Sequence, residues 1–315
     1  MSGREIDLSR VRTIPLGSRR SKVDAAALGH PIRAGASVAQ LVESLPDVLA
    51  ARELREVVAE LARRIRARRR VIVGMGAHPI KVGLSPLLID LLERGWVSAI
   101  AMNGAGIVHD FELALAGHTS EEVADELADG SFGMAAETGS FLNEAACEGA
   151  AAGVGLGEAV GKKISAARLP RAELSILAAA VRLGVPVTVH VALGTDIVHM
   201  HPSADGRAIG ETSLRDFRIL ADHVGGLEGG AFLNLGSAVI VPEVFLKALN
   251  LARNVGHVVR DLWTLDMDFN RHYRPLANVV TRPTLLGGRG VHLTGHHEIM
   301  FPLLCAALCE AVDAP

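Results

Sequence analysis

The sequence predicts an α/β fold built on a doubly wound, mostly parallel sheet of six strands. Short β-branched runs alternate with helix-like patterns between Val71 and Thr294. The first unit, residues 71–110, contains a strand, a helix and a second strand, and strands joined in this way lie parallel in one sheet. Glycines and polar residues follow these runs directly. In a parallel sheet such residues share the carboxyl edge, where open α/β folds bind ligands.

The unit at 71–110 begins with a strand over residues 71–73 and the loop GMGAHP. Ser85 is the expected N-cap of the following helix, with Pro86 as its first residue. The second strand, 97–101, ends in the glycine-bearing loop 103–106. Because glycine lets a ligand approach the backbone closely, both loops are candidate nucleotide-binding loops. GMGAHP lacks the third glycine of G-x-G-x-x-G, so a tight strand-to-helix turn is the alternative.

The other elements follow in chain order from their hydrophobic spacing. Helices are expected at 46–70, 119–129, 171–183, 213–223, 242–254 and 298–312, and strands at 187–192, 231–235, 257–264 and 291–294. Residues 1–45 are polar and aperiodic and are expected to form an arm that packs on a neighbouring subunit, followed by one domain at 46–315. The basic run RRIRARRR is expected to be the solvated end of the first helix.

Composition narrows the class of protein. With 49% hydrophobic residues, the 315-residue chain has enough apolar residues for a large core, and a net charge of −3 gives no reason to expect nucleic acid or an anionic membrane as partner. The three cysteines are scattered and the first residues lack an apolar signal-peptide core, so a reducing, cytoplasmic location is expected. The most apolar window, 174–193, contains Arg182 and Pro186 and reads as helix, turn and strand, which makes a membrane span an unfavoured interpretation.

Histidines are frequent in the loops that follow the strands. His199 and His201, with His78, His109 or His296, are candidate imidazole ligands, so a metal-dependent hydrolase is one alternative, although no HExxH or CxxC spacing is present. Neither Ser140 nor Ser237 lies in a G-x-S-x-G elbow, which argues against a serine hydrolase. Lys247 is the best placed of five lysines for a Schiff base, but a surface ion pair is the simpler interpretation.

Over about residues 70–310 the chain resembles the deoxyhypusine synthase family. NGAGIVHD is similar to the family's T-x-G-G-[VI]-E-E-D loop, and LNLARN to its A-N-L-x-R-N. GTD ends in Asp196, which matches the aspartate of P-[AV]-[LF]-T-D-G-S, and VHLTGHHEIMFPLL is similar to the closing [VY]-x-x-D-A-[ST]-x-x-F-P-L-L.

The resemblance implies a Rossmann-like, NAD-binding domain that is usually assembled as a homotetramer with active sites between subunits. It also implies cofactor contacts at the matching positions. These are Gly76, Ala77, His78, Asn103, Gly104, Ala105, Asp196, Gly236, Ser237, Thr264, Asp266, His296 and His297. Glycines there admit a pyrophosphate, and a carboxylate accepts hydrogen bonds from ribose hydroxyls.

Three departures from the family pattern affect the amine-transfer chemistry. The family's catalytic lysine lies in a segment like E-A-V-S-W-G-K, and the equivalent LANVVTRPT has Arg282 and Pro283 in its place. Arginine stays protonated and forms no imine. Val244 and Phe245 replace a pair of histidines, and His109 replaces one acidic residue of E-E-D. True deoxyhypusine synthase activity is therefore not expected.

The sequence thus leads to an NAD-dependent enzyme that removes hydride reversibly from a small amine, polyamine or amino acid. His109 and Asp110 are the candidates for proton transfer and for holding a cationic substrate, because a histidine titrates near neutral pH. Glu298 is the third candidate catalytic residue, beside His296 and His297 at the nicotinamide end. A non-catalytic, nucleotide-binding oligomer is the remaining alternative, because the family lysine is missing.

Overall fold

The computed structural model describes residues 3–313 and contains one sheet of six parallel strands in the order β3-β2-β1-β4-β5-β6. The strands are β1 (Val71–Met75), β2 (Ala99–Asn103), β3 (Val187–His190), β4 (Ala231–Leu235), β5 (Trp263–Asp268) and β6 (Arg289–Thr294). The predicted Rossmann-like α/β fold is confirmed. The strand order reverses between β1 and β4, and such a switch point is where open α/β sheets bind ligands.

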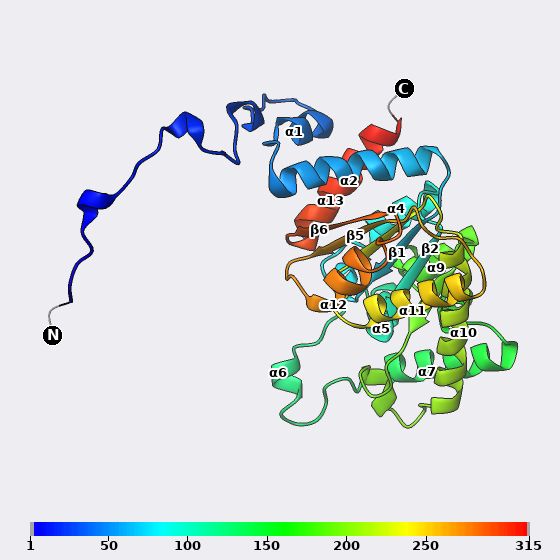
Figure 1. Ribbon diagram of the computed structural model, residues 1–315. Helices are drawn as coiled ribbons and strands as arrows, with labels where there is room; N and C mark the ends of the chain where they lie inside the picture. The colour runs from blue at the N-terminus through cyan, green and yellow to red at the C-terminus, as the bar shows by residue number, and fades with distance from the viewer. Residues whose placement is uncertain (1–2, 314–315) are drawn as a thin grey trace.

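Helices connect the strands and cover both faces of the sheet (Figure 1). The α-helices are α1 (Val38–Ser44), α2 (Leu49–Arg66), α3 (His78–Lys81), α4 (Ser85–Glu93), α5 (Gly104–Ala116), α6 (Val123–Glu126), α7 (Ala136–Ala152), α8 (Leu156–Ala167), α9 (Ile176–Leu183), α10 (Gly206–Gly225), α11 (Ile240–Asn254), α12 (Tyr273–Pro275) and α13 (His297–Asp313). Shorter segments include the 3-10 turns η4 (Ala172–Leu174) and η5 (Ile197–Met200) and the π-helix η6 (Leu276–Thr281).

In β1, β2 and β4, alternate residues bury their side chains in one of two cores. Val73 of β1 packs in the larger core with the helices α2, α4, α9 and α13, whereas its neighbour Ile72 packs in the smaller core beneath α10 and α11. Phe232 of β4 stacks on Phe245 of α11 with ring centroids 3.7 Å apart, which fixes α11 on this second face. Because apolar helices cover both faces, the strands carry continuous apolar runs.

The N-terminal arm, residues 3–36, leads away from the rest of the molecule (Figure 1). Its apolar side chains are exposed, among them Ile6 at 85% and Leu16 at 70%. The chain joins the body at α1, whose first backbone N–H groups, those of Val38 and Ala39, donate to the carboxylate of Glu310 in α13. The boundary expected at residue 45 stays a prediction.

Several predicted elements differ from the observed ones. The strand expected at 257–264 is wrong, because the apolar residues before Leu262 form a loop and β5 runs from Trp263 to Asp268. The helix expected at 119–129 is only the single turn α6, and Glu122 makes no side-chain cap. Ser85 is the first residue of α4 and its hydroxyl has no partner. Arg64 of the basic run is buried and pairs with Asp261 at 3.1 Å, so that helix end is not fully solvated.

Helix α10 satisfies the backbone of the edge strand β3 with side chains. Asp216 accepts the backbone N–H groups of Gly157 at 2.9 Å and Val189 at 2.8 Å. Ser213 accepts the N–H of Val191 and donates to the carbonyl of Val189. An unpaired strand edge is a template for aggregation, and this helix removes it. Among helices of the described residues, none is both long enough and apolar enough to cross a membrane.

Burial gives Asp216 a pH-dependent role in stability, because it raises the pKa of that carboxyl to about 7 from an ordinary 3.8. An acid whose pKa is higher in the folded state holds its proton longer when folded, so stability falls as the pH rises from 3.8 to about 7. This carboxyl contributes up to about 4 kcal/mol to that fall. Asp216→Asn is expected to flatten the slope, measured by urea unfolding across this pH range. Exposed Asp222→Asn is the control, and an unchanged slope in Asp216→Asn contradicts the assignment.

Candidate functional site

The turns after β1 and β4 meet at the switch point in direct backbone contact. The N–H of Gly76 donates to the carbonyl of Leu235 at 3.1 Å, and a Cβ atom on Gly76 would lie 2.6 Å from the carbonyl oxygen of Gly236. Gly236 has a φ of +65°, and a Cβ there would lie 2.9 Å from the ring of His297. Both positions therefore require glycine. Ala77 follows in the β1 turn and is partly exposed.

Four rings gather on the rim beside this contact. The ring of His78 lies 5.2 Å from that of His297 and 5.3 Å from that of Phe269, while Phe269 stacks on His296 at 6.2 Å. Burial lowers the pKa of His78. His297 is fully buried, its Nε2 lies 2.9 Å from the carbonyl of Met267, and its Nδ1 has no partner. Together these side chains form the ring cluster, an aromatic surface at the carboxyl ends of β1, β5 and β6.

A second group of residues surrounds the start of α5. Asn103 caps this helix by accepting the N–H of Gly106 at 3.2 Å. Asp196, from the loop after β3, is 92% buried against Gly104, where a Cβ would lie 1.9 Å from its Oδ2. Burial raises the pKa of Asp196, and its Oδ2 accepts no hydrogen bond. A carboxylate at this helix terminus excludes a phosphate, so the Asn103–Gly106 turn suits a hydroxyl or an amine.

An acidic cavity of about 250 Å³ opens beside Asp196. Its charged and polar lining side chains are Lys81, His109, Glu112, Ser120, Glu121, Thr195 and Asp196, and Ala105 also lines it. Three carboxylates face one ammonium group here, so the lining favours a cation. Helix α3 connects this cavity to the ring cluster, because its first residue is His78 and its last is Lys81.

His109, a predicted catalytic residue, lines the acidic cavity but is held by neighbours. Its Nδ1 lies 2.7 Å from the hydroxyl of Thr119, which donates to Glu112, and Thr138 also donates to Glu112 at 3.0 Å. Burial, helped by the nearby ammonium of Lys81, lowers the pKa of His109 to about 4. The imidazole is therefore neutral at physiological pH and available as a proton acceptor or hydrogen-bonding group.

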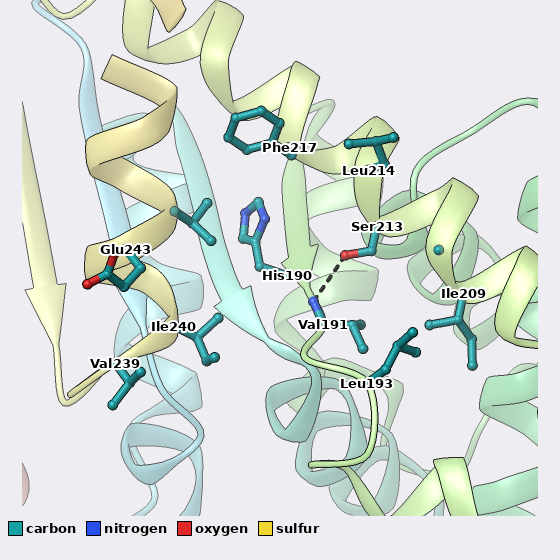
Figure 2. Close-up of a pocket in the computed structure, with 12 residues that line it drawn as sticks. His190, Val191, Leu193, Ile209, Ser213, Leu214, Phe217, Val239, Ile240 and Glu243 are labelled. Atoms are coloured by element: carbon teal, nitrogen blue, oxygen red, sulfur yellow. Dashed lines mark hydrogen bonds between the residues drawn. The ribbon is translucent and has the colours of Figure 1, made fainter. Parts of the chain in front are cut away.

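Figure 2 shows an apolar cavity of about 400 Å³ between α10 and α11, at the carboxyl end of β3. Val191, Leu214 and Ile240 are among its lining residues, and His190 lies between the two helices at its base. Burial lowers the pKa of His190 to about 3, so this ring stays uncharged. Glu243 points away from His190 on the outer side of α11 and pairs there with Lys247.

Asp110 occupies a structural position, in contrast to the catalytic role predicted from the sequence. It is fully buried and accepts from the hydroxyl of Ser175 and from the N–H of Ile176 at 2.7 Å, at the start of α9. Its pKa rises to about 6 through burial. The carboxylate satisfies the first backbone groups of a helix and has no exposed surface for a substrate.

Thr264 and Asp266 are also displaced from their predicted cofactor-binding roles, because β5 begins later than expected. Thr264 is the second residue of the strand, fully buried, and donates to the carbonyl of Val279 in η6. Asp266 is fully buried one layer below the rim. Ser237 uses its hydroxyl to accept the N–H of Val241 near the start of α11. Glu298 is exposed on α13, 3.7 Å from His296.

The candidate metal ligands do not converge. No group of three or more His, Cys, Asp or Glu side chains within residues 3–313 is arranged to hold a metal ion. His199 accepts the N–H of Gly194 with its Nδ1, and the Nε2 of His201 lies 2.8 Å from the carbonyl of Gly133. The metal-dependent hydrolase stays a prediction, without a group of ligands among these residues to support it.

Sequence reasoning missed several residues that the rim brings together. Lys81 lines the acidic cavity, whereas Lys247, the lysine singled out from the sequence, is exposed on α11. Asn234 and His292 lie inside strands, at positions where a polar residue interrupts an apolar run, and that interruption was the available signal. Among the buried atoms without a hydrogen-bond partner, three belong to residues in a strand or in a segment that follows one. They are Asp196 Oδ2, Asn234 Oδ1 and His297 Nδ1.

The chain is similar in fold to several solved structures. A LOR/SDH protein from Methanococcus maripaludis S2 superposes with a TM-score of 0.56 at 15% identity, over 84% of this chain and 71% of that one. A protein assigned as deoxyhypusine synthase from Entamoeba histolytica gives 0.52 at 12% identity, over 89% and 95%. AgrE, crystallised in a ternary complex with ornithine and NAD+, gives 0.53 at 17% identity over 84% of this chain. The present chain spans about a third (34%) of AgrE.

These likenesses place the fold among deoxyhypusine synthase-like structures, some of which are NAD-using enzymes. No protein-family model matches the chain, and a sequence search of curated proteins finds no match.

The structural role of Asp110 and the cavity position of His109 predict different changes in the free energy of unfolding when each residue is replaced by alanine. Asp110→Ala leaves buried backbone N–H groups without an acceptor and is expected to lower the free energy of unfolding by about 2 kcal/mol. His109→Ala, at a partly exposed cavity position, is expected to change it by less than about 1 kcal/mol. Urea unfolding of both variants makes the comparison. Equal stability of Asp110→Ala and the unmutated protein would show that the buried cap is not the role of this carboxylate.

Proposed function

We propose that this protein is an NAD-dependent enzyme that transfers hydride reversibly between the cofactor and a small amine, polyamine or amino acid. One observation carries the proposal. Two buried polar atoms without a partner, Asp196 Oδ2 and His297 Nδ1, belong to residues that follow strands at the carboxyl rim of a sheet with strand order 3-2-1-4-5-6. Buried polar atoms are normally hydrogen-bonded, so a ligand bound at this edge would supply the partners that these two atoms lack.

The residues at the switch point fit a dinucleotide. The turns at Gly76, Ala77 and His78 and at Gly236 and Ser237 present backbone without large side chains, as a pyrophosphate requires. Asp196 offers a free carboxylate oxygen to a ribose hydroxyl or an amine. The uncharged apolar cavity suits the adenine ring. When bound, the nicotinamide supplies the hydride acceptor, and His296 and His297 of the ring cluster are the residues proposed to flank it.

The proposed substrate class follows from the charges of the side chains that line the acidic cavity. Glu112, Glu121 and Asp196 outnumber Lys81 in the acidic cavity, so a protonated amine is the favoured occupant. In this proposal His109 is an uncharged hydrogen-bonding group and Asn103, Gly104 and Ala105 shape the cavity entrance. The ornithine and NAD+ bound by AgrE agree with this ligand pair. The exposed Glu298 is retained as a candidate that attracts the cationic substrate to the ring cluster.

Asp196 provides the direct test. Asp196→Asn removes the carboxylate charge at the start of α5, so binding of NAD+ or of L-ornithine, measured by calorimetry, is expected to weaken about 10-fold or more. NADH formation from ornithine, arginine, putrescine and spermidine, followed by absorbance, identifies the substrate class.

Asp222→Asn, an exposed carboxylate on α10, is the matched control and is expected to bind as the unmutated protein does. Absence of binding heat from NAD+ and NADH would exclude the proposed cofactor. Cofactor binding without turnover of any of these amines would favour the non-catalytic, nucleotide-binding alternative.

We also propose a cytoplasmic homo-oligomer, a tetramer by the family resemblance, in which the arm packs on a second copy of the chain. Ile6, Val11, Ile14 and Leu16 are 61–85% exposed along the arm, and α1 begins only at Val38. Side chains of this kind are normally buried, and no other part of residues 3–313 covers them.

Deletion of residues 1–34 is expected to lower the molar mass of the assembly measured by light scattering, because it removes this apolar contact. A variant with Arg4, Arg10 and Arg12 changed to serine keeps the apolar side chains and serves as control. A monomeric full-length chain, or an assembly unaffected by the deletion, would refute the arm's role.

A further inference from the structure

Two adjacent strands carry a connected row of polar side chains just below the rim. Asp266 of β5 and His292 of β6 are register partners, and the Nδ1 of His292 lies 2.7 Å from Oδ2 of Asp266. The Nε2 of His292 lies 2.9 Å from the hydroxyl of Thr294. The three side chains therefore form one continuous line from a carboxylate to a hydroxyl.

Burial along this line changes from complete to none. The Asp266 side chain is fully buried, that of His292 is 7% exposed, and Thr294 is exposed at the end of β6. Asn234 donates to Oδ1 of Asp266 at 2.7 Å and to the carbonyl of Ser237 at 2.9 Å, which holds the carboxylate in place. A nucleophile or proton donor within reach of a base, itself oriented by a third group, is the arrangement by which proteins activate a hydroxyl.

A comparison within the same sheet separates this line from an ordinary strand pair. Thr188 and His190 of β3 have the same spacing, and the hydroxyl and Nε2 are also 2.9 Å apart. Both residues are buried, and no carboxylate within residues 3–313 hydrogen-bonds to His190. The β6 pair differs in having Asp266 behind the imidazole and solvent in front of the hydroxyl. Both strands thus hold a threonine hydroxyl close to a histidine ring, but only β6 adds a carboxylate behind the ring and an exposed hydroxyl.

The surroundings of Thr294 match the proposed substrate. Asp268 is its register partner on β5 and is 98% buried, so a carboxylate adjoins the hydroxyl. Phe269 of the ring cluster follows Asp268 directly in the chain, and His296 lies two residues after Thr294. Asp268 thus places a carboxylate beside the point at which a substrate N–H or O–H group would meet Thr294.

We propose that Thr294, His292 and Asp266 form a proton-transfer centre in which the hydroxyl of Thr294 meets the substrate. The inference rests on the proposed function and deepens it, because oxidation of an amine or alcohol releases a proton as well as a hydride. The substrate N–H or O–H gives its proton to the oxygen of Thr294 while the proton of Thr294 passes to Nε2 of His292. The hydride and its electron pair leave the adjacent carbon for the nicotinamide, and a C=N or C=O bond forms.

In this scheme Thr294 is the catalytic residue, and His292 and Asp266 act through it. Asp266 orients the imidazole and stabilises the imidazolium that forms. The acceptor proposed from the sequence, His109, lines a different cavity and belongs to substrate binding in this assignment.

A fluorophosphonate tests the centre without substrate or cofactor. The Thr294 oxygen forms a P–O bond, the P–F bond breaks to release fluoride, and the hydroxyl proton passes to His292. Labelling of the full-length protein is followed by intact mass and located by peptide mass spectrometry. One label at Thr294 is expected, and His292→Gln and Asp266→Asn are expected to slow labelling about 100-fold. Thr294→Val abolishes it, whereas Thr294→Ser retains it.

Thr188→Val is the matched control and is expected to label at the unmutated rate. Labelling that is absent, occurs elsewhere or is unaffected by His292→Gln would overturn the inference, provided that circular dichroism shows the variants folded. NAD+ calorimetry on the same samples separates the two proposals. Labelling at Thr294 without cofactor binding would support the proton-transfer centre and contradict the NAD-dependent function. Cofactor binding without labelling would support the NAD-dependent function and contradict the proton-transfer centre.

Discussion

The parallel direction of all six strands is the constraint on which the rest of the structure depends. Each connection returns over a face of the sheet, so every strand ends at the same rim. Residues as distant in sequence as His78 and His297 thereby come within 5.2 Å of each other between ring centroids. The reversal of strand order between β1 and β4 opens that rim at one point, and the paired glycines there allow the two turns to touch.

Buried carboxylates in this protein fall into two kinds according to their hydrogen bonds. Asp110 and Asp216 accept from backbone N–H groups and hold helix starts or a strand edge, so their burial is compensated locally. Asp196 keeps one oxygen without a partner at the rim. An unsatisfied buried polar atom costs free energy, and a protein retains such an atom where a ligand supplies the missing partner. By this criterion Asp196 is the acid that we propose to bind a ligand, whereas Asp110 and Asp216 have structural roles.

The departures from the deoxyhypusine synthase pattern have a structural explanation. Phe245, at one position of the missing histidine pair, stacks on Phe232 in the core, and Val244 lines the apolar cavity. Arg282, in place of the family lysine, follows the π-helix η6 and donates to Asn278 at 2.7 Å.

The sequence by itself determined the class of fold, because hydrophobic spacing and glycine-ended strands report local geometry that tertiary contacts did not override. It also indicated that Gly76, Gly236 and Asp196 lie at strand ends, for the same local reason. Only the tertiary structure decided which polar side chains hydrogen-bond to another helix or strand. Asp110 is a cap because α9 lies against it, and Asp266 is a partner of His292 because β5 begins six residues later than its apolar residues suggested. Strand register and helix docking set those contacts over long sequence separations, and no pattern within a single segment carries that information.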